Sequence, residues 1–129
     1  MRYRLFDYVN AKGENEFKQW TEGLEKVQRA KLNEKLDKLQ LYGDGLHPHM
    51  LTDTGTPGIQ KLRVKGNVQL RPLLCKGPVQ IDSEYTLLMG AKEVDGKWVP
   101  REAPSTADTL KQAVIADPLG RRKNHERVC

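Results

Sequence analysis

The spacing of apolar residues changes several times along the 129-residue chain, and each change predicts a different element. Residues 3–9 form a short aromatic and aliphatic run that is typical of a strand. From residue 14 onward, apolar residues recur every three or four positions, as on one face of a helix. This stripe moves by one position after Val27, so we expect two helices over residues 15–26 and 29–42, joined by a tight turn.

Strands return after a loop over residues 43–58, which is rich in Gly, Pro, Thr and Asp. Alternation of apolar and polar residues then predicts strands, which we place over residues 59–65, 68–75 and 85–92. Pro72 cannot donate a hydrogen bond to a central ladder, so we expect a bulge or a local edge at this position.

The first two of these strands form a hairpin, whose register follows from keeping the apolar side chains on one face. A two-residue turn over residues 66–67 sets Val64 opposite Gln69 and mixes the two faces. A three-residue loop over residues 65–67 sets Val64 opposite Val68, and this is the register that we expect.

The remaining chain predicts a smaller hairpin or loop, a helix and a tail. An Asp-Gly pair within residues 94–99 is typical of a tight turn. The helix begins at Ser105, with Asp108 at the capping-box position, and Pro118 ends it. The basic segment over residues 121–129 is expected to be loose.

These elements predict an α+β fold. An N-terminal strand and a helical hairpin pack on a twisted, mainly antiparallel sheet of about four strands, followed by a C-terminal helix. The length is typical of a single domain, which we place over residues 1–120, with a basic tail over residues 121–129. The two helices carry equal numbers of acidic and basic residues and are interpreted as a scaffold.

The excess of positive charge is concentrated in the predicted hairpin. The formal net charge is +5, and no acidic residue lies between Asp53 and Asp82. The expected register gathers Lys61, Arg63 and Arg71 on the face away from the core, with Lys65 at the tip. Opposed like charges destabilise a sheet, so they indicate a polyanionic partner, nucleic acid first, although lysines also protect strand edges from pairing. The basic residues of this interval are Lys61, Arg63, Lys65, Arg71 and Lys76.

Other classes of protein fit the sequence less well. Apolar runs are too short to span a bilayer, the first ten residues lack a signal-peptide core, and two cysteines are too few for a disulfide scaffold. We therefore expect a cytoplasmic protein with no membrane partner. No phosphate-binding glycine loop and no zinc-ligand spacing occurs, so we expect neither a metal nor a small-molecule cofactor. The hairpin lacks aromatic residues, which favours contacts with phosphates over base stacking.

A cationic face without a metal can promote chemistry on RNA, because RNA carries its own nucleophile, the 2′-hydroxyl. Arginine and lysine would stabilise the extra negative charge that develops on the phosphate. The reaction also needs a group that accepts a proton, and the sequence does not identify it. His47 and His49 are candidates for acid–base work, although histidines in such a loop are more often only exposed residues.

Four segments resemble a known family. GENEFKQWTEGL, RAKLNEKLDKLQLYGDGL, GIQKLRVKGNVQLRPLL and YTLLMGAKE occur in the order found in the RelE/ParE toxin superfamily, specifically its HigB-like, phage-derived branch. The resemblance implies the toxin of a type II toxin–antitoxin pair, which cleaves mRNA on the ribosome without a metal and is neutralised by a cognate helix-turn-helix antitoxin. It also implies catalytic roles for Arg63, Arg71 and Lys92. The other cations of the basic interval, Lys61, Lys65 and Lys76, are expected to hold the RNA backbone.

The sequence departs from this family at positions that bear on activity. Lys61 stands where the family has an acid, and Glu93 replaces the second lysine of a pair. A non-catalytic protein of the same fold, which binds nucleic acid or inhibits a host target such as gyrase, is therefore the alternative.

Overall fold

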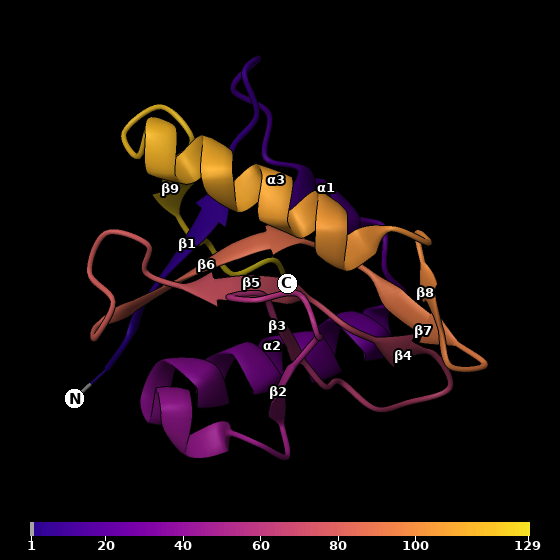
Figure 1. Cartoon of the computed structure of the whole chain (residues 1–129). Coiled ribbons are helices and arrows are strands. Elements are labelled where there is room, and N and C mark those ends of the chain that lie inside the picture. The colour runs from indigo at the N-terminus through magenta and orange to yellow at the C-terminus, as the bar shows by residue number, and fades with distance from the viewer. Residues whose placement is uncertain (1) are drawn as a thin grey trace.

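A six-stranded sheet runs through the middle of the computed structural model, which describes residues 2–129 (Figure 1). The strand order is β2-β3-β5-β6-β1-β9. All neighbouring strands are antiparallel except β1 and β6, which are parallel. The prediction of a mainly antiparallel α+β fold is confirmed, but the sheet is larger than the four strands expected. Its members are β1 (Arg4–Tyr8), β2 (Leu51–Asp53), β3 (Gln60–Leu62), β5 (Leu73–Lys76), β6 (Glu84–Met89) and β9 (Arg122–Asn124).

A second, three-stranded sheet lies at one end of the first (Figure 1). It contains β4 (Gln69–Leu70), β7 (Lys92–Val94) and β8 (Lys97–Val99), in the order β4-β7-β8. The turn between β7 and β8 places Asp95 at a φ of 52° and Gly96 at 76°, as a tight two-residue hairpin turn requires. The small hairpin predicted from the Asp-Gly pair is confirmed.

Helices cover both faces of the large sheet (Figure 1). On one face, Leu32, Leu36 and Leu39 of α2 (Lys26–Tyr42) pack against sheet residues such as Leu74. On the other face, α3 (Ala103–Ala116) packs against neighbouring sheet residues such as Leu73. Because successive side chains of a strand point to opposite faces, burial on both sides explains the continuous apolar runs of β5 and β6.

The helices differ from their predicted bounds, and α2 begins at Lys26, three residues before its predicted start at Arg29. The Asn15 side chain accepts a hydrogen bond from the Lys18 amide and begins α1 (Glu16–Glu22), which ends earlier than expected. The Arg29 guanidinium donates to carbonyls at the end of α1 and just beyond it, including Leu24 O at 2.8 Å. The helix α3 begins at Ala103, two residues before the predicted start at Ser105, with Pro104 in its first turn. Its N-cap is Glu102, so the capping box predicted from Ser105 and Asp108 is wrong.

The register predicted for the basic hairpin is wrong. Val64 pairs with Leu70 rather than with Val68, and the loop spans residues 65–69. This shift of two positions leaves each side chain on its expected face. The second strand is broken at Pro72, as its lack of a donor predicts, and the two halves enter different sheets as β4 and β5.

The region read as a loop over residues 43–58 contains the short 3₁₀ helix η1 (Gly43–Leu46) and the edge strand β2. The basic tail is not loose either, because β9 pairs with β1 and side chains of the tail contact buried acidic residues. His125 Nδ1 lies 2.8 Å from Asp7 Oδ1, and Arg122 pairs with Glu84. These contacts lie too far apart in sequence for local patterns to indicate them. No helix within residues 2–129 has both the length and the apolar character needed to cross a bilayer.

Candidate functional site

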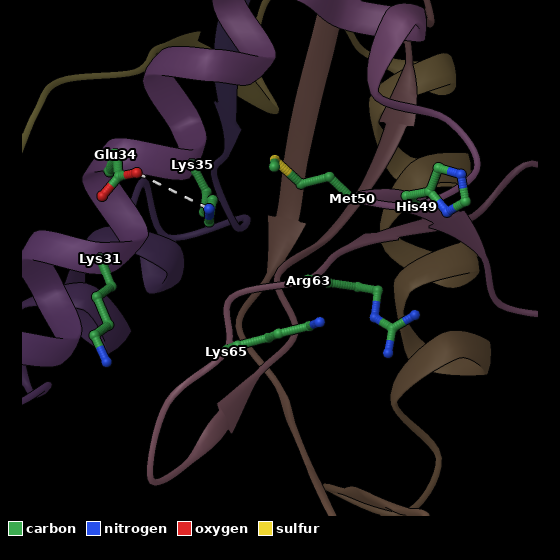
Figure 2. A pocket seen from close by; sticks show the side chains of 7 residues that line it. All are labelled: Lys31, Glu34, Lys35, His49, Met50, Arg63 and Lys65. Carbon is green, nitrogen blue, oxygen red and sulfur yellow. Dashed lines mark ion pairs between the residues drawn. The ribbon is translucent and has the colours of Figure 1, made fainter.

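A pocket of about 370 Å³ opens between α2 and the segment that connects β3 to β4 (Figure 2). One wall comes from the helix, and the other comes from the residues that enter β2 and leave β3. Most of its lining side chains are basic, and Glu34 is the one acidic residue among them. The lining residues are Lys31, Glu34, Lys35, His49, Met50, Arg63 and Lys65.

The helical wall follows from the leucine stripe of α2. Leu32 and Leu36 are buried against the sheet, so Lys31 and Lys35, which precede them, lie at the border of the buried face. A spacing of four residues places the two lysines on the same side of the helix. A Cβ atom at Gly66 would lie 3.3 Å from Nζ of Lys31, which shows how closely helix and loop approach.

The strand wall follows from the pairing of β2 with β3. Leu51 lies opposite Leu62, and beyond this pair the Arg63 amide donates a hydrogen bond to Met50 O at 2.8 Å. Met50 and Arg63 are therefore cross-strand neighbours, one apolar and one cationic. Figure 2 shows Met50 extending from its strand toward α2, and Lys65 extending toward Arg63.

The electrostatic balance of the pocket is strongly positive. Within residues 2–129, no ion pair involves Lys31, Arg63 or Lys65. Glu34 contacts Lys35 at only 4.0 Å and lies closer to Lys38, at 3.5 Å. Arg63 Nε is buried without a hydrogen-bond partner, which is costly for a charged group. The pocket is suited to an anion.

His49 places an imidazole in the wall of the same pocket. An imidazole is a group that can accept or donate a proton, so His49 could act as an acid or a base beside a bound anion. The other loop histidine, His47, instead lies 3.4 Å from Asp53 at the surface. The structure therefore brings Arg63, Lys65 and His49 together from the residues that the sequence indicated.

No protein-family model, curated protein or solved structure matches the chain. The resemblance to RelE/ParE toxins accordingly stays a prediction.

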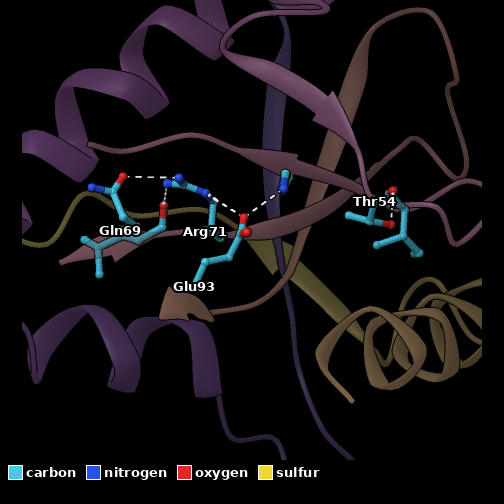
Figure 3. A network of polar contacts seen from close by, with 7 residues as sticks. Thr54, Gln69, Arg71 and Glu93 are labelled. Carbon is cyan, nitrogen blue, oxygen red and sulfur yellow. Dashed lines mark hydrogen bonds and ion pairs between the residues drawn. The ribbon is translucent and has the colours of Figure 1, made fainter. Parts of the chain in front are cut away.

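Arg71 has a different environment from Arg63, although both were expected to act together. It is buried, and its Nε atom lies 2.9 Å from Glu93 Oε1 (Figure 3). Its other nitrogens donate to Leu70 O and to Gln69 Oε1. Each of the three guanidinium nitrogens thus has a hydrogen-bond partner within the protein.

Lys61 shares the carboxylate of Glu93 with Arg71, at 2.7 Å from the same oxygen, and its Nζ lies 5.2 Å from the centroid of the Trp98 ring. The expected register set Lys61 opposite Arg71, but in the structure Lys61 lies opposite Leu73. Burial acts to raise the pKa of Glu93, but the hydrogen bonds and charges of Lys61 and Arg71 outweigh it and lower that pKa.

The remaining predicted site residues lie elsewhere. Lys76 Nζ is 2.6 Å from Asp44 Oδ2. This contact raises the pKa of Lys76, while the pKa of Asp44 is lowered by Lys76 and Tyr85 against the effect of burial. Lys92 is exposed on β7 and lines a separate groove with Trp20.

Sequence reasoning did not single out Lys31, Lys35 or Met50. A signal existed for the two lysines, because residues 31, 35 and 38 are all lysine at helical spacing. Met50 had no such signal, since it lies in a segment that reads as a loop. Among the described residues, no group of three or more His, Cys, Asp or Glu side chains is arranged to hold a metal ion.

Proposed function

We propose that the protein is a toxin-type endoribonuclease that binds mRNA on the ribosome at this pocket and thereby inhibits translation. The observation that carries the proposal is the convergence of four cations, Lys31, Lys35, Arg63 and Lys65, on one pocket that also contains an imidazole. Positive groups that meet in a concave site attract a polyanion and concentrate their field on one phosphate.

The chemistry follows from RNA itself. The 2′-hydroxyl attacks the adjacent phosphate, so a bond from O2′ to phosphorus forms and the bond from phosphorus to O5′ breaks. The products are a 2′,3′-cyclic phosphate and a free 5′-hydroxyl. One proton leaves the 2′-hydroxyl and one reaches the departing O5′, and His49 is the group in the pocket that can carry either transfer.

The cations take complementary roles in this reaction. Arg63 and Lys65 stabilise the charge of the pentavalent phosphorane, which is usually the largest contribution to catalysis of this kind. Lys31 and Lys35 hold the neighbouring phosphates against the helix. Arg71, which the resemblance makes catalytic, is assigned here to supporting the hairpin, because Glu93 and the backbone occupy its guanidinium. A cognate antitoxin would neutralise the protein by covering the pocket with acidic side chains.

The experiment compares cleavage of a ribosome-bound mRNA by the wild type, by Arg63→Ala and by Lys97→Ala, with growth arrest followed in parallel. Lys97 is an exposed cation on β8, outside the pocket, and controls for loss of charge alone. We expect the wild type and Lys97→Ala to cleave and to arrest growth, whereas Arg63→Ala does neither. Equal cleavage by all three proteins would refute the assignment.

The alternative is a protein of the same fold that binds nucleic acid without cleaving it. It is favoured by Glu93, which neutralises part of the positive charge of the hairpin. In that case the wild type binds RNA, Arg63→Ala binds it weakly, and no 2′,3′-cyclic phosphate forms. Chromosomal DNA damage on expression would instead indicate a gyrase-directed inhibitor.

A further inference from the structure

Met50 introduces an apolar surface into a pocket that is otherwise basic. Its side chain packs partly against the core cluster beneath α2 and partly lines the pocket. The Arg63 amide donates a hydrogen bond to Met50 O at 2.8 Å, and Figure 2 shows the Met50 side chain extending toward α2 while the Arg63 side chain extends in the other direction. A ligand that fills the pocket therefore meets the apolar side chain of Met50 at one part of the lining and the cationic side chain of Arg63 at another.

The size of the pocket argues against a phosphate group as its whole occupant. A volume of about 370 Å³ falls within the range of small-molecule sites, which begins at about 300 Å³. The alkyl stems of Lys31 and Lys35 add to the apolar part of the lining, because long lysine side chains cover surface with their methylene groups. A ligand that fits this lining is thus an anion that also carries a weakly polar group.

We propose that the pocket holds one unpaired nucleotide, with its phosphate at Arg63 and Lys65 and its base against the Met50 thioether. The inference rests on the proposed function and adds that the bound RNA is single-stranded, because a base inside a duplex cannot enter a pocket. Sulfur is polarisable and contacts aromatic rings favourably. A methionine therefore provides the base contact that aromatic residues supply in other single-strand binders, and the basic hairpin has no aromatic residue of its own.

The test measures binding of two short 2′-deoxy oligonucleotides, which cannot be cleaved because they lack the nucleophile. One is intact, and the other has an abasic site at the central nucleotide. We expect Met50→Ala to weaken binding of the intact oligonucleotide about three- to tenfold, and to leave binding of the abasic one unchanged. Met50→Leu should retain most of the affinity, because it keeps the apolar surface.

Two further variants control for a void at position 50 and for the loss of any methionine. Met50→Gln keeps the length of the side chain but makes it polar, so it should behave like Met50→Ala without leaving a void. Met89→Ala removes a methionine that packs on the opposite side of the sheet, near α3, and should bind both oligonucleotides like the wild type. Equal weakening of both oligonucleotides by Met50→Ala, or no weakening at all, would overturn the base contact.

The proposed function has a separate readout. If Arg63→Ala binds both oligonucleotides as tightly as the wild type, the pocket is not the nucleic-acid site, and both proposals fail together. If Arg63→Ala loses binding while Met50→Ala behaves like the wild type, phosphate binding at the pocket stands and only the base contact is refuted.

Discussion

Two clusters of cations lie on the same hairpin and differ in what neutralises them. At one end, Arg63 and Lys65 face a pocket and form no ion pair within residues 2–129. At the other end, Lys61 and Arg71 both contact one carboxylate oxygen of Glu93, a residue of β7. Each cluster contains one arginine and one lysine. They differ because Glu93 pairs with Lys61 and Arg71 and not with Arg63 or Lys65.

The contrast shows that the number of cations on a strand does not identify a binding site. A buried arginine that already has three partners has little to offer a phosphate, because those bonds would have to break first. Arg63 lines the pocket and forms no ion pair within residues 2–129, so its guanidinium is free to take a phosphate as a partner. We therefore expect the pocket cluster to determine function and the Glu93 cluster to determine stability.

Replacing one arginine of each cluster by alanine should give the largest difference between the clusters in cleavage rate and in stability. Arg63→Ala should lower the rate of RNA cleavage about 100- to 1000-fold, the usual cost of removing a group that stabilises developing charge. Its urea unfolding should match that of the wild type. Arg71→Ala should show the opposite pattern, with a lower unfolding midpoint and near-normal cleavage per folded molecule. If Arg71→Ala loses cleavage without losing stability, the division between the clusters is wrong.

Removing the shared acid should have the next largest effect. Glu93→Gln leaves the buried Arg71 guanidinium without its charged partner, and we expect the free energy of unfolding to fall by about 2 kcal/mol. Urea titration followed by circular dichroism measures this change. Glu34→Gln is the matched control, because that acid is largely exposed and its loss should change stability by less than about 0.5 kcal/mol. Equal losses in both variants would contradict the comparison.

Acid should weaken the Glu93 cluster selectively. The fold lowers the pKa of Glu93, so its ionised form contributes stability above the ordinary pKa of 4.5, and this contribution is lost as the pH falls through the lowered value. Below pH 4.5 the wild type should therefore lose stability more steeply than Glu93→Gln. Asp44 has a lowered pKa as well, and Asp44→Asn serves as a second comparison. Parallel pH curves for the wild type and Glu93→Gln would contradict this prediction.

The faces of the hairpin could be predicted from sequence, but the division between the clusters could not. Alternation assigns Leu62 and Val64 to the core and the cations to the other face, and this holds although the register is shifted by two residues. The chain leaves the second sheet for the first at Pro72, and just before this residue the Arg71 amide donates a hydrogen bond to Ala91 O at 2.8 Å. This pairing brings in Glu93 from 22 residues away, beyond the reach of any local pattern.

The same limit applies to the pocket. Lys31 and Lys35 belong to a helix whose charges balance, so composition indicates only a scaffold. Their partners across the pocket, Met50 and Arg63, are fixed by the pairing of a three-residue edge strand that lies within a region rich in Gly, Pro and Thr. Helical spacing indicates that the lysines share a side, while only the tertiary packing of α2 shows what they face.

The salt dependence of oligonucleotide binding should also differ between variants of the two clusters, although this effect is smaller than the effects on cleavage and stability. Each phosphate contact with a single strand contributes about −0.7 to the slope of log K against log salt concentration. Lys31→Ala should therefore make this slope less steep by about 0.7, and Lys61→Ala should change it little, because Lys61 is already paired with Glu93. Fluorescence anisotropy with a 2′-deoxy oligonucleotide at several salt concentrations measures both. Equal slope changes would show that Lys61 reaches the nucleic acid as well.

The smallest expected effect comes from the one acid of the pocket. Glu34 lies 4.0 Å from Lys35 and 3.5 Å from Lys38, and exposed pairs of this kind contribute at most about 1 kcal/mol. Glu34→Gln frees Lys35 and removes a repulsive charge, so oligonucleotide binding should tighten about twofold at low salt, and the gain should vanish at high salt because screening removes it. Glu102→Gln, at the exposed N-cap of α3, should leave binding unchanged. Weaker binding by Glu34→Gln would mean that the carboxylate contacts the nucleotide directly, and would place an attractive group where we infer a repulsive one.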